Sequence, residues 1–167
     1  ATEMHQWHGN SREGRFRSEI RNLGALVSGG TDHKDMIRLV DCFSGIGVGA
    51  EYVSGSKKEI VEQVARAIDS QCAPIVGVRF SGGGGHWMMA VGYQGYEDGE
   101  GFQLTHILCL DPAGETPRTS LWNAVINVYE EDGSSVGSGP LPSNYWGYDG
   151  LLHNCRVEDA LVICGAD

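Results

Sequence analysis

Residues 82–93 read GGGGHWMMAVGY, and this stretch is the starting point for predicting the structure of the second half of the chain. Four glycines favour a turn, and the apolar run behind them has the composition of a strand. His86 stands at the junction, where a strand would anchor its imidazole beside an open loop. Two interpretations follow: a structural histidine that happens to begin a strand, and a catalytic base at the edge of a sheet.

The segments around this stretch extend the sheet. Alternating or continuous apolar runs predict further strands at residues 47–54, 74–80, 105–110, 120–129 and 159–164. The Gly-, Ser- and Pro-rich residues 130–150 predict a long surface loop. The aromatic residues of NYWGYDG (144–150) either pin that loop or line a binding groove.

Helical patterns come earlier in the chain. In residues 56–72, Ser56 is a predicted N-cap with Glu59 three residues on, ahead of an apolar stripe at helical spacing. Further helices are predicted at residues 1–8 and 11–26, and one after Thr31 or Asp32. Helices first and a mostly antiparallel sheet second predict an α+β fold, in a single domain over residues 1–167.

Composition excludes several classes of protein. The 167 residues are 41% hydrophobic and 8% aromatic, which fits a folded core and argues against disorder. The formal net charge of −10 argues against nucleic-acid binding, which needs basic patches. The apolar runs are too short to span a membrane, so no membrane partner is expected.

Five cysteines form no CxxC pair, so neither a zinc site nor another metal or cofactor is expected. Cys42, Cys109 and Cys164 lie in apolar contexts, which predicts buried free thiols and a reducing compartment.

The strand at His86 and the strand that ends at Asp111 test the catalytic interpretation. If Asp98-Gly99 is a two-residue hairpin turn, His86 lies directly opposite Asp111, with Cβ atoms about 5 Å apart. A bulge at a nearby glycine would change this register. A carboxylate that orients an imidazole supplies two of the three groups of a nucleophilic triad.

The pair GGHWMMAVGY (84–93) and ILCLDPAG (107–114) resembles the second half of papain-like cysteine peptidases. The likeness is to the bacterial branch of C39-like and effector-type enzymes, and it covers roughly residues 30–115. It implies a papain-like fold, in which N-terminal helices pack on a mostly antiparallel sheet. His86 matches the family's catalytic histidine and Asp111 its orienting acid.

The family's nucleophilic cysteine opens its first long helix, and this chain begins with ATEMHQWHG instead. Three explanations stay open: the cysteine lies just upstream of Ala1, Ala1 replaces it, or the protein is a pseudo-enzyme. Cys109 lacks a helix N-terminus, and Cys42 falls late in a helix, so neither fits the role. Cys155 and Cys164 follow His86 and Asp111, against the order of the family, and Cys72, which precedes a strand, stays open without being assigned the role.

The resemblance implies a cysteine peptidase that cleaves a protein or peptide substrate, as a bacterial toxin or effector. Such a protein would be cytoplasmic, or secreted into a target cell, where an immunity or inhibitor protein is an expected partner. Two alternatives remain: an inactive module that binds a peptide or partner protein, and an amidase or deamidase that uses the same residues.

Overall fold

The computed structural model describes residues 32–165 except residues 100, 116 and 118. The chain divides into two compact units, residues 1–50 with 165–167 and residues 51–164. Helix α2 (His33–Asp41) belongs to the first unit and begins at Asp32, whose carboxylate accepts a hydrogen bond from Asp35 N. The predicted helices at 1–8 and 11–26 lie outside the described residues. The single-domain expectation stays a prediction.

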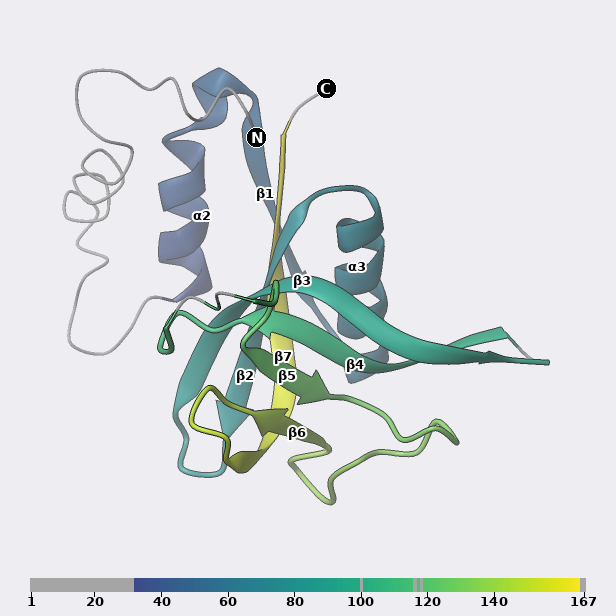
Figure 1. Ribbon diagram of the computed structural model, residues 1–167. Helices are drawn as coiled ribbons and strands as arrows, with labels where there is room; N and C mark the ends of the chain where they lie inside the picture. The colour runs from purple at the N-terminus through teal and green to yellow at the C-terminus, as the bar shows by residue number, and fades with distance from the viewer. Residues whose placement is uncertain (1–31, 100, 116, 118, 166–167) are drawn as a thin grey trace. The chain divides into compact units, whose positions relative to one another are not determined.

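The second unit is built on antiparallel strands (Figure 1). A seven-stranded sheet has the order β1-β7-β2-β3-β4-β5-β6, and β6 also pairs with β7, so that six of its strands close into a barrel. The strands are β1 (Val48–Ser54), β2 (Ala73–Phe80), β3 (Gly85–Asp98), β4 (Gly101–Leu110), β5 (Ala124–Asn127), β6 (Ser143–Trp146) and β7 (Leu152–Gly165).

Strand β7 closes the barrel because it pairs with β6 over Leu152–Cys155 and with β2 over Cys155–Ile163. Cys155 faces Ser143 of β6 and Phe80 of β2. Between the pairs Gly77↔Asp159 and Val78↔Val157, Glu158 is an extra residue on β7, which makes a β-bulge. Its carboxylate accepts hydrogen bonds from Arg79 Nε (2.5 Å) and Arg156 Nη2 (2.8 Å).

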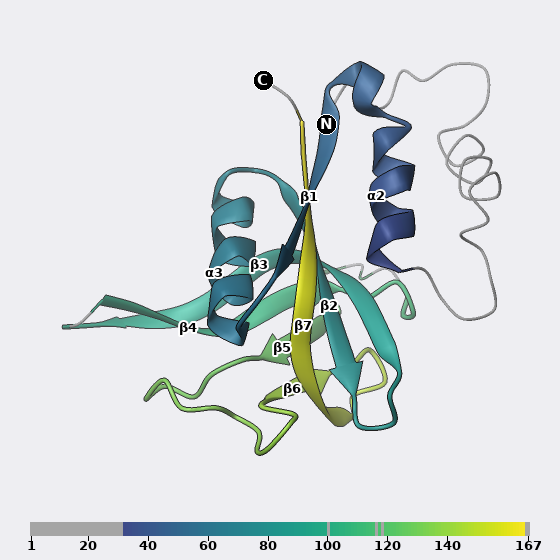
Figure 2. The same cartoon turned by 180° about the vertical axis from the view of Figure 1, so that it is seen from behind.

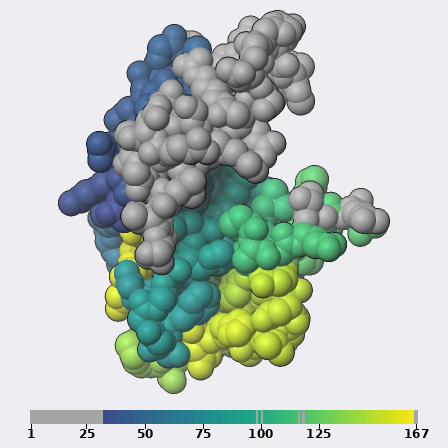
Figure 3. Space-filling model, turned by 90° about the vertical axis from the view of Figure 1, so that its left-hand side faces the viewer, coloured from purple at the N-terminus to yellow at the C-terminus, as the bar shows by residue number. Residues whose placement is uncertain are grey.

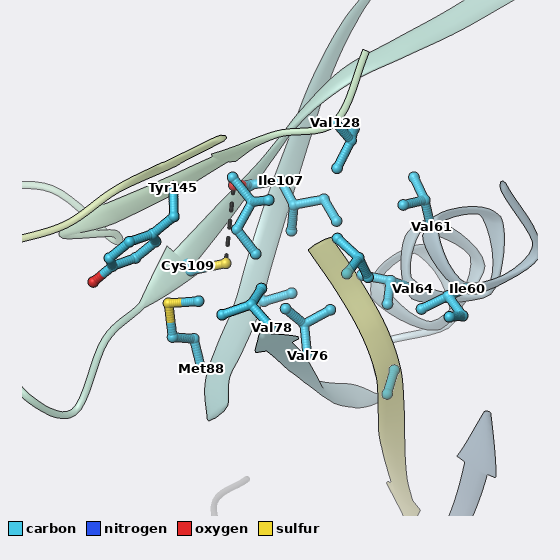
Figure 4. Close-up of a cluster of buried hydrophobic side chains, with 14 of the residues drawn as sticks. Ile60, Val61, Val64, Val76, Val78, Met88, Ile107, Cys109, Val128 and Tyr145 are labelled. Carbon is cyan, nitrogen blue, oxygen red and sulfur yellow. Dashed lines mark hydrogen bonds between the residues drawn. The ribbon is translucent and has the colours of Figure 1, made fainter. Parts of the chain in front are cut away.

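Helix α3 (Lys57–Asp69) packs against β2 and β3. Both ribbon views show it beside β3 (Figures 1 and 2). Ser56 and Glu59 form the predicted capping box, in which each side chain accepts a hydrogen bond from the other residue's backbone N–H. The buried stripe of α3 joins one hydrophobic cluster with the inward side chains of the strands (Figure 4). Ile60, Val64, Val76 and Ile107 have no exposed surface there.

The predicted papain-like α+β fold is wrong. The described residues hold two short α-helices, and the sheet is closed by β6–β7 pairing instead of lying open beneath helices. The wrong fold was inferred from the resemblance of the motifs around His86 and Asp111 and from the order of predicted helices and strands. The high Gly, Ser and Pro content of residues 130–150 had also predicted a surface loop throughout. Ser143–Trp146 of that stretch form β6, whose two inward side chains, Ser143 and Tyr145, are buried.

The cysteine prediction also needs correction. Cys72, just after α3, and Cys164, near the end of β7, form a disulfide. Cys42 is free but exposed, and only Cys109 and Cys155 are buried free thiols among the described residues. The pairing Ala73↔Ile163 brings the two disulfide partners together, an encounter that spacing along the chain does not reveal.

Thiol reactivity tests this assignment. Without denaturant or reductant, we expect iodoacetamide to label Cys42 alone among the five cysteines. Burial raises the pKa of the Cys155 thiol to about 12 and that of Cys109 above its usual range, so both stay protonated as well as inaccessible. Peptide mass mapping would read the result, and rapid labelling of Cys72 or Cys164 before reduction would contradict the disulfide.

A candidate catalytic histidine–aspartate site

Adjacent strands bring His86 and Asp111 together. His86 is the second residue of β3, and Asp111 follows the last residue of β4. The observed pairs Asp98↔Gly101 and Met89↔Leu110 differ by two residues from the predicted register, in which Met89 would face residue 108. Two irregularities, between Ala90 and Gly92 and between Gln94 and Gly95, offset the pairs between them by one further residue, as a bulge would. They cancel at Met89↔Leu110, where the net shift of two residues keeps the faces, so His86 and Asp111 are diagonal neighbours. His86 Nε2 lies 2.7 Å from Asp111 Oδ1.

The Asp111 side chain is buried, and its carboxylate accepts three hydrogen bonds. Its Oδ1 accepts hydrogen bonds from His86 and from Ala113 N (2.8 Å), and its Oδ2 accepts one from the Tyr145 hydroxyl. Burial by itself raises the pKa of this carboxyl, but the hydrogen bonds from Tyr145, Ala113 and His86 outweigh burial and hold the pKa below its usual value. Asp111 is therefore an anion at neutral pH.

Asn123 fixes the backbone at the same place. Its Oδ1 accepts a hydrogen bond from Asp111 N (2.6 Å), and its Nδ2 donates to Asp111 O (3.1 Å). Asn123 directly precedes β5, which pairs with β4, so the neighbouring strand positions this clamp. No motif in the sequence pointed to a role for Asn123.

The ionised carboxylate sets the tautomer of His86. A carboxylate only accepts hydrogen bonds, so in the neutral imidazole Nε2 carries the proton and Nδ1 keeps its lone pair. Nδ1 has no hydrogen-bond partner among the residues that the structure describes, and the side chain is 26% exposed. This arrangement can take a proton from a group that approaches Nδ1.

Tyr145 is the third member of the network and was not predicted as such. Its ring joins the hydrophobic cluster while its hydroxyl points away from it (Figure 4). Burial and the neighbouring Asp111 raise the pKa of this phenol, so it remains a neutral donor. The stretch NYWGYDG had suggested groove-lining aromatics. Burial alternates along SNYW, but the buried Ser143 is polar and the exposed Trp146 is apolar, so hydropathy in the sequence does not show this alternation.

These groups open on a cavity of about 320 Å³. Besides His86 and Asp111, it is lined by aromatic rings (Phe80, Tyr145, Tyr148) and by a second acid and histidine, Asp149 and His153. In Figure 3 the teal atoms of β2 and β3 lie beside yellow-green atoms from the C-terminal part of the chain. The lining thus combines residues 80–86, from the β2–β3 part of the chain, with residues 145–153, from the β6–β7 part.

The described residues supply no nucleophile to this cavity. No Ser, Thr or Cys is among its lining residues. Cys109 lies on β4 with no exposed surface, and its Sγ is directed to Ile107 O at 3.9 Å. Nor do three or more His, Cys, Asp or Glu side chains of the described part gather as metal ligands.

Comparisons with protein-family models, curated proteins and solved structures gave no match. None of the helices within the described residues is long and apolar enough to cross a membrane. The properties of the site therefore follow from its own geometry.

Acid unfolding tests the ionised state of Asp111. Because its folded-state pKa is lowered, the carboxylate stabilises the fold above its unfolded pKa of about 3.9, and this contribution is lost as pH falls through the folded pKa. We expect Tyr145→Phe to lower the free energy of unfolding at pH 7 by about 1.5–3 kcal/mol, the usual value of a hydrogen bond to a charged group. The loss should shrink in acid, where Asp111 is protonated.

Urea unfolding across pH 3–7 would measure this effect. Tyr93→Phe is the matched control, because the Tyr93 hydroxyl donates to Asp69 at 2.9 Å in an exposed pair and its removal should change stability little. Equal and pH-independent losses in the two variants would contradict a buried, ionised Asp111.

Proposed function

We propose that the protein is a thiol hydrolase that cleaves peptide or amide bonds of a protein substrate, with His86 as general base and acid and Asp111 as its positioning residue. The observation that carries the proposal is the 2.7 Å contact between His86 Nε2 and Asp111 Oδ1, which leaves Nδ1 free beside a cavity. The motif resemblance around His86 and Asp111 to cysteine peptidases gives the same roles.

In the proposed reaction, His86 Nδ1 carries the transferred proton at each step. A cysteine thiol gives its proton to His86 Nδ1 while its sulfur attacks the substrate carbonyl carbon. The imidazolium, stabilised by Asp111, then gives that proton to the leaving amine as the C–N bond breaks, and a thioester remains. A water molecule then gives a proton to Nδ1 while its oxygen bonds to the acyl carbon. The C–S bond breaks, the carboxylic acid is released, and Nδ1 gives the proton to the sulfur, which restores the thiol.

The nucleophile is proposed to lie before Ala1 in the natural protein, or to be replaced by Ala1. Residues 1–31 contain no cysteine. Cys109 and Cys155 are buried, and Cys72 and Cys164 are oxidised to a disulfide. Cys42 is the C-cap of α2, where the negative end of the helix dipole disfavours a thiolate, and its Sγ donates to Arg38 O at 3.3 Å.

The disulfide favours the secreted location over the cytoplasmic one, because such bonds persist in oxidising compartments. A toxin or effector role, with an immunity or inhibitor protein as partner, remains part of this proposal.

One observation favours a second candidate. Since the described lining of the cavity holds no nucleophile, the same groups would serve a binding module for a peptide or partner protein.

A deamidase would use His86 and Asp111 in the same way as a peptidase, and the two differ only in the amide that enters the cavity.

Cysteine labelling in the full-length natural protein separates enzyme from binding module. A catalytic cysteine paired with His86 is a thiolate at pH 6.5, where an ordinary thiol is about 1% ionised. We expect an iodoacetamide-labelled peptide other than that of Cys42 to form fast at this pH. His86→Ala should slow it by roughly 10–100-fold, and Asp111→Asn should slow it as well.

Two controls frame that measurement. Cys42 is an exposed thiol in the same molecule, and its labelling rate should not change in any variant. His106→Ala removes a histidine of β4 that lies outside the cavity and should leave all rates unchanged. If no cysteine reacts faster than Cys42, the hydrolase proposal fails and the binding module stands.

A further inference from the structure

The cavity beside His86 contains a second carboxylate with a different environment. Asp149 Oδ1 accepts a hydrogen bond from Leu151 N at 3.0 Å, and Oδ2 lies 3.4 Å from His153 Nε2, a long contact. The backbone hydrogen bond from Leu151 is the main cause that lowers the pKa of Asp149, so it is an anion at neutral pH. Its side chain is 39% exposed, in contrast to the buried Asp111.

Aromatic rings form the wall next to this carboxylate. The ring centroids of Phe80 and Tyr145 are 5.7 Å apart, and those of Tyr145 and His153 are 5.9 Å apart. Tyr148, directly before Asp149, also lines the cavity and is 56% exposed. Exposed faces of tyrosine rings attract cations, and planar guanidinium groups also stack on them.

The charges of the cavity are unbalanced. Two carboxylates face it, while no Lys or Arg is among the described residues that line it. Asp111 is occupied by three hydrogen bonds from within the protein, but Asp149 has only one short bond, to Leu151 N. Asp149 is therefore the carboxylate that is available to a ligand.

We propose that this cavity is a specificity subsite for a cationic side chain of the substrate, best fitted by arginine, with Asp149 as its anionic partner and Tyr148 as a stacking surface. A guanidinium offers two parallel N–H donors to a carboxylate and a flat face to a ring, whereas an ammonium offers a point charge. This inference rests on the proposed function, because the bound cationic group belongs to a substrate only if the protein is a hydrolase. It makes the protein a hydrolase of bonds next to basic residues.

Binding can be measured without turnover. Nα-acetylarginine amide and Nα-acetylcitrulline amide have nearly the same shape, but citrulline carries no charge. In an NMR titration of the full-length protein at pH 7, the arginine compound should shift the side-chain resonances of Tyr148 and His153. It should bind at least roughly tenfold more tightly than the citrulline compound, and Asp149→Asn should remove the difference.

The matched control is Asp132→Asn. Asp132 lies in a turn and accepts a hydrogen bond from Ser134 N at 2.9 Å, the same local arrangement as Asp149 with Leu151, but it does not line the cavity. This variant should keep the preference for arginine. In Asp149→Asn the amide oxygen can still accept the hydrogen bond from Leu151 N, and the same spectra report whether the variant is folded.

The outcomes separate this inference from the proposed function. Equal affinities for the two compounds, or an arginine preference that survives Asp149→Asn, would overturn the subsite. If arginine binds selectively while no cysteine labels fast, the subsite stands and the hydrolase proposal falls. If a reactive cysteine is found but neither compound shifts Tyr148 or His153, the hydrolase stands and the subsite falls.

Discussion

A buried negative charge at Asp111 is the constraint on which the rest of the site depends. A carboxylate with 3% of its surface exposed is costly unless hydrogen-bond donors compensate its lost hydration. The donors here are Tyr145, Ala113 N and His86, which come from β6, from the segment after β4 and from β3. The charge therefore ties three separate parts of the chain to one point, and it fixes the His86 tautomer through the last of these bonds.

The closed barrel makes that convergence possible. Strand β6 reaches Asp111 only because it pairs with β5 on one side and β7 on the other. The disulfide from Cys72 to Cys164 joins the start of β2 to the end of β7 and closes a loop with a sequence separation of 92 residues. By loop entropy such a cross-link stabilises the fold by about 4–5 kcal/mol. His86 thus lies on β3, which pairs with β2 on one side and β4 on the other within the closed barrel.

Local patterns in the sequence were sufficient to predict much of the secondary structure of the second unit. The Ser56–Glu59 capping box, the strand β2 and the approach of His86 to Asp111 follow from short-range rules of capping, strand composition and hairpin pairing. The register was wrong by two residues because the turn begins one residue later than Asp98-Gly99 implied. The contact survived, since an even shift keeps the faces.

The missed features all depend on contacts between distant residues. Strand β6 is four residues long in a Gly- and Pro-rich stretch, and its partners β5 and β7 decide its conformation. The Cys72–Cys164 disulfide and the Tyr145–Asp111 hydrogen bond need the closed barrel before they can form. The papain-like fold was inferred from the motif resemblance around His86 and Asp111, and two short motifs do not determine how the strands of a sheet close.

The tautomer of His86 is the most direct test of the account. Long-range ¹H–¹⁵N spectra of the protein at pH 8 distinguish a protonated Nε2 from a protonated Nδ1. We predict the Nε2–H form in the wild type, with Nδ1 unprotonated, and a mixture of forms in Asp111→Asn because the amide can accept or donate a hydrogen bond. A wild-type His86 protonated at Nδ1 would show that Asp111 does not orient the imidazole and would contradict its role as the base.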